Sequence, residues 1–310
     1  MIEVQELVKK YGSTVAVDRV SFRVERGELF GLLGPNGAGK TTTISVLSTL
    51  LPADGGRAVV AGCDVARDAG GVRRRIGMVP QEIALYLDLS ARDNLNFWGR
   101  LYGLSGSDLQ ARVEEMLEAV ELGAHARQKV ASFSGGMKRR LNLAAGLMHG
   151  PEVLFLDEPT VGIDAQARSK ILALIRRLNE EGLTVLYTTH YLEEAEQLCD
   201  RIGVIDRGRL VALGDKDELI RQIGDEDTIS FLLPPERLPE LRELALGWDL
   251  LGEVEHRRGC ARLRVRDTAR VLPEVQDWLA ARDLPLEHLE VHRPNLETLY
   301  LNLTGRALRE

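Results

Sequence analysis

The chain has 310 residues, of which 44% are hydrophobic and 28% charged, a balance typical of a globular protein with one large or two ordinary domains. Its net charge of −7 argues against nucleic-acid binding through bulk electrostatics. No apolar run approaches the ~18–20 residues of a membrane-spanning helix, and the residues after Met1 do not resemble a cleaved signal peptide. Three widely spaced cysteines, Cys63, Cys199 and Cys260, are expected to be reduced thiols, as in a cytosol.

The first 62 residues contain several short segments with the composition of strands. Antiparallel strands are expected at 2–4, 15–17 and 21–24, with another at 58–62. An apolar run at 29–33 predicts a buried strand of a different kind, because it does not alternate with polar residues.

A glycine-rich loop joins this apolar run to a helix-like segment at 43–51. The loop fits the phosphate-binding pattern G-x-x-x-x-G-K-[ST] at every position, with Gly34, Pro35, Asn36, Gly37, Ala38, Gly39, Lys40, Thr41 and Thr42. Glycines let successive N–H groups face one phosphate chain, and the following helix N-terminus adds positive potential. We therefore expect Lys40 to reach the β- and γ-phosphates and the Thr41 hydroxyl to bind Mg²⁺.

The middle of the chain is predicted to be rich in helices. A strand-like segment at 76–79 comes before Pro80 and Gln81, and the apolar segment 83–87 follows. A capped helix start is expected at 89–95, and residues 108–120 and 141–148 have the apolar spacing of helices. Residues 83–150 are therefore expected to form a helical subdomain.

A second glycine-containing helix start lies at 132–137. Ser134, Gly135 and Gly136 precede an amphipathic segment at 138–148, so exposed N–H groups there would form another anion site. One nucleotide does not need two phosphate-binding helix ends from one chain, and a second copy of the chain would explain the excess.

Two carboxylates follow the apolar run 153–156, which predicts another buried parallel strand. Asp157 and Glu158 would emerge at the carboxyl end of the strand, where open α/β sheets bind ligands. Asp157 is expected to bind Mg²⁺ directly or through water, and Glu158 to act as the general base for the attacking water.

The next segments predict a helix at 166–181, a strand at 184–187, a helix at 192–199 and a hairpin of strands at 202–205 and 208–211. Strands that alternate with helices indicate an α/β fold with a mainly parallel sheet.

In this order the motifs resemble those of the nucleotide-binding subunit of an ATP-binding cassette (ABC) transporter, over about residues 1–215. The matching positions are Tyr11 for the aromatic that stacks on adenine, Gly34–Thr42 for the Walker A loop, Gln81 for the Q-loop glutamine, Phe133–Met137 for the signature sequence, Asp157 and Glu158 for Walker B and the catalytic glutamate, Val161–Asp164 for the D-loop, and His190 for the switch histidine. The resemblance implies a P-loop ABC ATPase domain with a mixed sheet, an antiparallel β subdomain and a helical subdomain.

The signature and the D-loop depart from the family pattern at a few positions. Phe133 and Met137 replace the usual Leu and Gln, and Val161 and Ile163 replace the commoner Ser and Leu. The centre of the signature and Asp164 are kept, so the site is interpreted as active.

The resemblance also implies a mechanism. Two copies would enclose two ATP molecules with Mg²⁺, with the Walker motifs of one copy facing Ser134, Gly135 and Gly136 of the other. Glu158 would activate water, His190 would lie near the γ-phosphate, and Gln81 would bind Mg²⁺ and report the state of the phosphate. An exposed apolar patch near 83–98 would receive a separate membrane permease, so the chain would be cytoplasmic and peripheral on the inner face of the membrane.

Residues 224–310 lie outside the cassette, which is expected to cover 1–220. Strand-like segments at 231–233, 253–256, 263–265 and 288–291 alternate with two helices, in which Pro239 and Pro273 fit the first turn. This pattern predicts two β-α-β units, the arrangement of a small ferredoxin-like domain. His256, His288 and His292 are interpreted as solvated strand residues. The segment, including its ending Pro294–Leu301 and Thr304–Arg306, resembles the C-terminal extension of daunorubicin-resistance-type export ATPases of type-2 exporters.

Three other functions compete with this interpretation. A soluble ABC ATPase of translation or DNA repair usually has two cassettes or a long coiled coil, and neither is found here. A non-hydrolysing sensor conflicts with the presence of Glu158 and His190. An importer motor differs only in direction, which, like the cargo, is not encoded in this subunit. The resemblance implies export of a drug-like or other hydrophobic small molecule.

Overall fold

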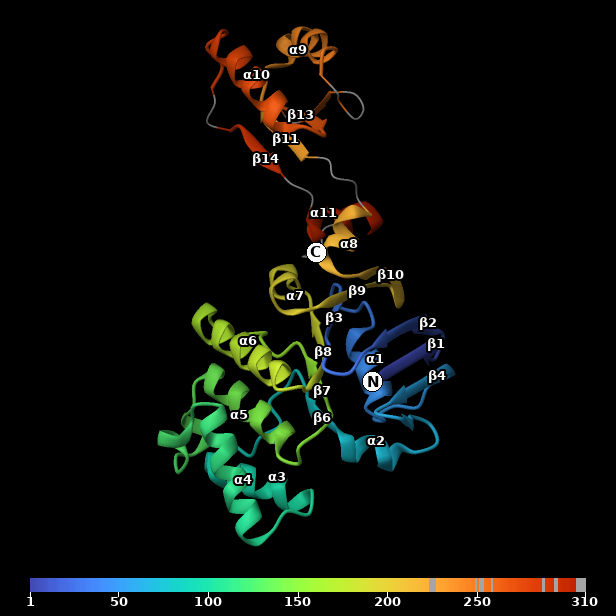
Figure 1. The fold of residues 1–310 in the computed structure, drawn as a ribbon, viewed down its shortest axis with the longest axis vertical. Helices are drawn as coiled ribbons and strands as arrows, with labels where there is room; N and C mark the ends of the chain where they lie inside the picture. The colour runs from blue at the N-terminus through green and yellow to red at the C-terminus, as the bar shows by residue number, and fades with distance from the viewer. Residues whose placement is uncertain are drawn as a thin grey trace. The chain divides into compact units, whose positions relative to one another are not determined.

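The computed structural model describes residues 1–222, 227–248, 250, 254–257, 259–285, 288–292 and 295–304. The chain divides into two compact units, Met1–Lys216 and Asp217–Ala307 (Figure 1). The domain limits expected from the sequence, 220 and 224, remain a prediction. None of the described helices has the length and apolar character that crossing a membrane requires.

The first unit is built around a six-stranded sheet. Its order is β10-β9-β3-β8-β7-β6, and every pair is parallel except β10 with β9, which confirms the expected mainly parallel sheet and closing hairpin. The strands are β3 Leu29–Leu33, β6 Ile76–Val79, β7 Val153–Asp157, β8 Thr184–Thr189, β9 Arg201–Asp206 and β10 Arg209–Gly214. All residues of β3, β7 and β8 are buried, as the apolar runs predicted for central strands covered on both faces.

Two hydrophobic clusters pack against this sheet. Side chains along β7 alternate between them, with Leu154 and Leu156 in one cluster and Val153 and Phe155 in the other. The helices associated with the sheet are α1 Lys40–Leu47, α2 Ala69–Arg75, α6 Ala165–Glu180 and α7 Leu192–Leu198. Helix α1 begins and ends earlier than the predicted 43–51, because the chain leaves helical geometry at Thr49, where φ is +64°.

An antiparallel sheet of order β2-β1-β4-β5 forms the N-terminal side of the unit. Its strands are β1 Ile2–Tyr11, β2 Thr14–Val24, β4 Gly55–Val60 and β5 Cys63–Asp64. The separate strands expected at 15–17 and 21–24 are therefore wrong, since both belong to β2. The ladder between β1 and β2 contains register shifts that interrupt the regular pairing without ending either strand. The backbone has φ of +48° at Glu6 and +52° at Arg19.

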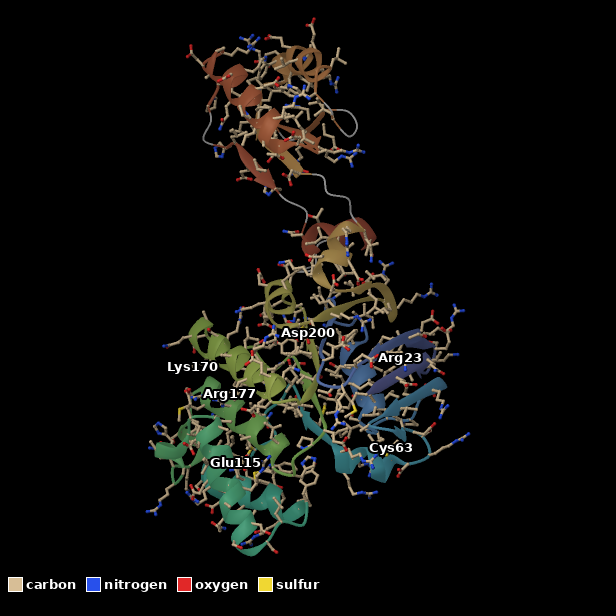
Figure 2. All side chains as sticks on the ribbon, in the orientation of Figure 1. Arg23, Cys63, Glu115, Lys170, Arg177 and Asp200 are labelled. Carbon is tan, nitrogen blue, oxygen red and sulfur yellow. The ribbon has the colours of Figure 1, made fainter. Side chains whose placement is uncertain are left out.

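Three helices form the subdomain predicted at 83–150, on the other side of the parallel strands from β1 and β2 (Figure 1). They are α3 Ala91–Leu101, α4 Gly106–Ala119 and α5 Gly135–Leu147, with short 3₁₀ helices at Gly123–His125 and Val130–Ser132. The Ser90 hydroxyl caps α3 by accepting a hydrogen bond from the Asp93 N–H, which confirms the expected helix start. Arg177, which lies with Lys170 along α6 in Figure 2, donates to the Ala119 carbonyl at 2.6 Å and so links α6 to the end of α4.

The second unit contains a four-stranded antiparallel sheet of order β12-β13-β11-β14. Its elements are α8 Lys216–Arg221, β11 Asp227–Leu232, a 3₁₀ helix Pro235–Arg237, α9 Leu238–Ala245, β12 Glu255–Arg257, β13 Cys260–Val265, α10 Thr268–Ala280, β14 Glu290–His292 and α11 Leu296–Thr304. From β11 to β14, two β-α-β units in this strand order make the split arrangement of a ferredoxin-like domain, as predicted. Alternate residues of β13 are buried in a core of their own: Ala261, Leu263 and Val265.

Some details of the second unit differ from expectation. Pro239 lies in the first turn of α9 as predicted, but Pro273 lies inside α10. The prediction for Pro273 is wrong because Asp267 caps the helix one turn earlier, by accepting from the Arg270 N–H at 3.1 Å. His256 is only half-exposed, and its Nε2 lies 2.8 Å from the Leu233 carbonyl oxygen. Parts of the predicted pattern, Glu253, Pro294, Gly305 and Arg306, lie outside the described residues.

Candidate functional site

The predicted loops meet at one edge of the parallel sheet. The phosphate-binding loop follows β3, Asp157 ends β7, and His190 follows β8, and these strands are neighbours in the order β3-β8-β7. Carboxyl ends of adjacent parallel strands form the usual ligand site of an open α/β sheet. The Gly34 N–H donates to the Thr189 carbonyl at 3.2 Å, which joins the start of the loop to the end of β8.

The loop turns directly into α1 at Gly39. This residue has φ of +108°, and a Cβ atom there would lie 2.6 Å from the Ala16 carbonyl oxygen. Only glycine fits both the conformation and the space. Helix α1 therefore begins at Lys40 with its free N–H groups directed toward the loop, as an anion site requires.

Lys40 lies buried at the centre of the loop. Its Nζ donates to the Gly34 and Pro35 carbonyls at 2.6 and 3.0 Å and forms an ion pair with Glu158 Oε1 at 3.0 Å. The side chains of both ion-pair partners are less than 7% exposed. A shielded pair of this kind interacts much more strongly than a surface pair.

Oxygen donors suited to Mg²⁺ lie beside Lys40. Thr41 Oγ1 donates to Asp157 Oδ1 at 3.2 Å, and Thr188 Oγ1 donates to the same oxygen at 2.7 Å. Mg²⁺ is bound by one or two carboxylates with phosphate oxygens and water, so the Thr41 hydroxyl and the Asp157 carboxylate fit it. The described residues contain no group of three or more His, Cys, Asp or Glu that could hold a metal, so these two would act together with a phosphate.

Glu158 and His190 form a pair across the ends of β7 and β8. His190 Nδ1 lies 3.1 Å from Glu158 Oε2, while Glu158 Oε1 faces Lys40. Glu158 has φ of +45°, a conformation that non-glycine residues rarely adopt, and its N–H donates to Thr188 Oγ1 at 3.0 Å. Strained backbone of this kind is concentrated at functional sites.

Gln81 lies two residues after the end of β6 and is exposed. Its side chain makes no hydrogen bond with another described residue, but its carbonyl accepts a hydrogen bond from Arg139 Nη1. Arg139 belongs to α5, and its Nη2 donates to the Val161 carbonyl at 3.2 Å. One guanidinium thus joins the predicted Q-loop and D-loop to the signature helix.

The signature residues lie at the start of α5. Ser134 caps this helix by accepting from the Met137 N–H at 3.3 Å. A Cβ atom on Gly136 would lie 2.6 Å from the Ala167 Cβ, and one on Gly135 would lie 3.6 Å from Ile163, so both glycines face the segment of the predicted D-loop and α6. Within the described residues, no hydrogen bond joins them to the phosphate-binding loop of the same chain.

Two further predicted residues, Tyr11 and Asp164, lie at the ends of secondary-structure elements. Tyr11 ends β1 in the tight hairpin with β2, is 50% exposed, and has Lys9 Nζ 5.9 Å from its ring centroid. Asp164 of the predicted D-loop caps α6 by accepting from the Ala167 N–H at 2.8 Å.

Sequence reasoning assigned no role to Thr188 and Arg139, although both contact site residues. Thr188 stands two positions before His190, and its place on a central strand beside β7 was the available signal. Arg139 carried no signal, because the carbonyls that it binds are 58 and 22 residues away in sequence.

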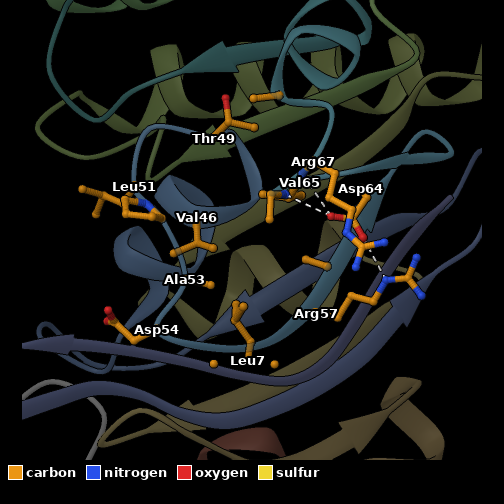
Figure 3. Close-up of a pocket in the computed structure, with 16 residues that line it drawn as sticks. Leu7, Val46, Thr49, Leu51, Ala53, Asp54, Arg57, Asp64, Val65 and Arg67 are labelled. Atoms are coloured by element: carbon orange, nitrogen blue, oxygen red, sulfur yellow. Dashed lines mark hydrogen bonds and ion pairs between the residues drawn. The ribbon is translucent and has the colours of Figure 1, made fainter.

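A cavity of about 720 Å³ lies elsewhere in the first unit (Figure 3). Leu7 and Val46 line one side, while Arg57, Asp64 and Arg67 lie together on another. Arg57 Nε donates to Asp64 Oδ2 at 2.9 Å, so these two side chains neutralise each other's charge. The cavity shares no residue with the loops described above.

A phosphate-binding loop, a carboxylate pair and a histidine at the ends of adjacent parallel strands define a P-loop nucleoside triphosphatase. A family model described as ABC transporter matches residues 17–161. The chain is 45% identical to the linearmycin resistance ATP-binding protein LnrL of Bacillus subtilis, over all of both chains. It is 44% identical to the daunorubicin resistance ATP-binding protein DrrA3 of Streptomyces coeruleorubidus, over 98% of this chain and 96% of the relative. The Nod factor export ATP-binding protein I of Ralstonia nicotianae is 40% identical over 100% of this chain and 95% of the relative.

Solved structures agree with this similarity. One, of an ATP-binding subunit of an ABC transporter, has a TM-score of 0.66 and 31% identity, and the match covers 72% of this chain and 93% of that one. Another, a dimeric ATP-binding cassette in a post-hydrolysis state bound to ADP and phosphate, has a TM-score of 0.64 and 27% identity over 69% of this chain and 98% of that one. The chain belongs to the ABC transporter family, as an ATP-binding subunit whose ATPase activity is coupled to transport.

Proposed function

We propose that two copies of this chain drive the export of a hydrophobic small molecule through a separate membrane permease. Linearmycin, daunorubicin and Nod factor in the names of the relatives support an exported small molecule. The dimeric cassettes among the structural neighbours support a pair of copies. The chain would then act at the cytoplasmic face of the membrane, held there by its partner.

The residues have separate roles in this proposal. Lys40 and the N–H groups of the loop bind the phosphates, Thr41, Asp157 and Gln81 bind Mg²⁺, and Tyr11 stacks on adenine. Bound Mg²⁺ would neutralise phosphate charge and orient the phosphates. Glu158 accepts a proton from the attacking water, and His190 holds Glu158 in place through the 3.1 Å contact. The signature residues Ser134, Gly135 and Gly136 bind the phosphate of the nucleotide on the other copy.

The observation that carries the permease partner is an exposed apolar patch directly after Gln81. We define the patch as Tyr86, Leu87, Leu89 and Phe97, whose side chains are 38–49% exposed. The sequence predicted exposed apolar side chains in this region, and their exposure confirms that part of the prediction. The rings of Tyr86 and Phe97 pack edge-to-face at 4.8 Å, so these two side chains form one apolar surface within the patch. Such surfaces mark binding sites for other proteins.

The test is a pull-down of the Glu158→Gln chain from detergent-solubilised membranes with MgATP, analysed by mass spectrometry. Recovery of a protein with several membrane-spanning segments supports the proposal and identifies the cargo pathway. Recovery of ribosomal or DNA-bound proteins without a membrane protein would overturn it.

A matched pair of variants locates the docking surface. Leu87→Ser and Phe97→Ser together, in the Glu158→Gln background, should abolish recovery of the permease while ATP binding persists. Leu246→Ser is the control, because Leu246 is 85% exposed but lies in the second unit.

A further inference from the structure

Glu194 is a buried carboxylate that none of the roles above uses. It lies in the first turn of α7 and is 2% exposed. Three hydroxyl groups donate to it: Thr160 Oγ1 to Oε1 at 2.7 Å, Tyr187 Oη to Oε2 at 2.7 Å, and Thr189 Oγ1 to Oε2 at 2.8 Å. Arg168 Nε lies 3.4 Å from Oε1.

This arrangement suits a charged carboxylate. An ionised carboxylate only accepts hydrogen bonds, and here every hydroxyl can donate. Burial and the adjacent Glu194 carboxylate raise the pKa of Tyr187 well above its usual value, so its hydroxyl stays protonated. Placing a charge in the interior is costly, and short charge-assisted bonds together with the Arg168 cation offset that cost.

The groups that bind Glu194 come from both loops of the catalytic pair. Thr160 is two residues after Glu158, on the loop that leaves β7. Thr189 immediately precedes His190, and its Oγ1 also accepts from the Tyr191 N–H at 2.9 Å, which fixes the turn around the histidine. One carboxylate therefore joins the two loops whose side chains meet at 3.1 Å in the pair of Glu158 and His190.

A second path runs from Glu194 to His190 through side chains. The Arg168 guanidinium carbon lies 4.5 Å from the centroid of the Tyr191 ring, and the Tyr191 ring lies 4.1 Å from that of His190. Arg168 is in the first turn of α6, the helix that Asp164 caps. The orientation of the histidine is therefore connected to the segment after Glu158 and to the start of α6.

We propose that Glu194 is a positioning residue for ATP hydrolysis, which fixes the Glu158 loop and the His190 turn relative to each other. The hydroxyl groups that bind Glu194 lie on β8 and on the loop after β7, and among the described residues no hydrogen bond or ion pair joins Glu194 to the phosphate-binding loop. Its loss should therefore reduce the rate of the chemical step and leave nucleotide binding nearly unchanged. Loss of a residue that only stabilised the core would not reduce the rate of the chemical step while leaving nucleotide binding unchanged.

The first experiment compares Glu194→Gln with the wild type as purified full-length chains. The amide keeps the shape but loses one acceptor, so the loops should shift by a fraction of an ångström. We expect kcat to fall about 10- to 100-fold, as for other lost supports of a catalytic group, with the Kd for ATP within about twofold. Glu193→Gln, an exposed neighbour on the same helix, is the control and should behave as wild type. An unchanged kcat, or equal losses of kcat and ATP binding, would overturn the proposal.

A double-mutant cycle with His190→Ala tests whether Glu194 acts through the pair, with hydrolysis followed in single turnovers. If it does, Glu194→Gln should lower the rate of the His190→Ala chain far less than that of the wild type. Equal effects in both backgrounds would show a general structural role.

If Glu194→Gln does not fold, milder variants at Thr160 and Thr189 test the same proposal. Thr160→Val removes one donor at nearly constant volume and should lower kcat without changing the Kd for ATP. Thr189→Ser, which keeps the hydroxyl, should retain more activity than Thr189→Val. Equal activity of the last two would contradict the role of the hydroxyl.

Discussion

At the scale of single residues, the site is a chain of charged contacts in which each group has a defined neighbour. Lys40 Nζ contacts one oxygen of Glu158, and His190 contacts the other. Thr188 holds the Asp157 oxygen that also faces Thr41. These contacts orient the carboxylates, and one of them, between Lys40 and Glu158, occupies an ammonium group to which a phosphate would bind.

The ion pair of Lys40 and Glu158 leads to a prediction for the Glu158→Gln variant. A neutral amide cannot serve as the base, so ATP hydrolysis should fall at least about 100-fold. The same change removes the anion that competes with phosphate for Lys40, so ATP should bind several-fold more tightly. Equilibrium binding of a fluorescent ATP analogue and a phosphate-release assay measure the two effects.

The matched control is Glu152→Gln, since Glu152 precedes β7 and its side chain is 45% exposed. Weaker ATP binding by Glu158→Gln would show that the ion pair does not compete with the nucleotide.

Sequence patterns point to individual candidate site residues but not to the contacts that hold them. Lys40, Asp157 and Glu158 stand in spacings that phosphate and metal chemistry require, so local patterns single them out as candidates. Glu194 is one of three glutamates within four residues, and nothing local distinguishes it from Glu193 and Glu196. Its partners come from α6, β8 and the loop after β7, and only the folded sheet brings these together.

At the scale of elements, α5 is connected to two loops by one side chain. Arg139 donates to the carbonyls of Gln81 and Val161. Burial lowers the pKa of its guanidinium, which still remains charged because arginine is not deprotonated in proteins. Asn142 of the same helix accepts from the Ala84 N–H at 3.1 Å. The segment after Gln81 is therefore held to the helical subdomain.

Arg139→Met should loosen that attachment while keeping the apolar stem of the side chain. We expect amide hydrogen exchange in residues 81–90 to become faster and kcat for ATP to fall several-fold. Lys138→Met, the preceding residue of α5, is the control. Unchanged exchange in 81–90 would mean that Asn142 and Asn94, whose Oδ1 accepts from the Tyr86 N–H at 2.8 Å, hold the segment without Arg139.

Helix α9 is joined to the segment that follows α10 by a carboxylate whose contribution to stability depends on pH. Hydrogen bonds from Arg282 and Arg237 lower the pKa of Glu240 below its usual 4.5. A lowered pKa in the folded state stabilises the protein above the unfolded value, and this stability is lost as the pH falls through the folded value. Glu240→Gln should therefore lose less stability than wild type on acidification below about pH 4.5, as measured by urea unfolding. A parallel loss in both proteins would contradict this role.

Element boundaries were predictable where a capping side chain or a first-turn proline defines them. Ser90 and Pro239 lie at the predicted starts of α3 and α9. The start of α10 was misjudged because Pro273 looked like a first-turn residue, whereas Asp267 supplies a stronger start signal. The continuity of β2 was missed because the bulged ladder around Arg19 interrupts the alternation.

At the scale of the whole molecule, the hydrophobic residues fall into separate cores. Two clusters share the parallel sheet of the first unit, and a third contains described residues of the second unit alone. Each unit therefore has the apolar interior that independent folding requires.

We expect thermal unfolding in two transitions that different probes resolve. Two of the three tryptophans, Trp248 and Trp278, belong to the core of the second unit, so fluorescence should follow mainly that unit. Circular dichroism reports the helices of both units. MgATP should raise the midpoint of the first unit only, because a ligand stabilises the part that binds it. Coincident transitions that shift together with MgATP would contradict independent units.

The contacts of the Lys40 ammonium group affect the order of events in a catalytic cycle. An ammonium group has three N–H donors, and those of Lys40 face Gly34, Pro35 and Glu158. A phosphate oxygen can bind this lysine only by displacing one of these acceptors. If the displaced group is Glu158, binding of the substrate would free the carboxylate that we propose as the base. In that case Glu158 would become available for proton transfer only after ATP has bound.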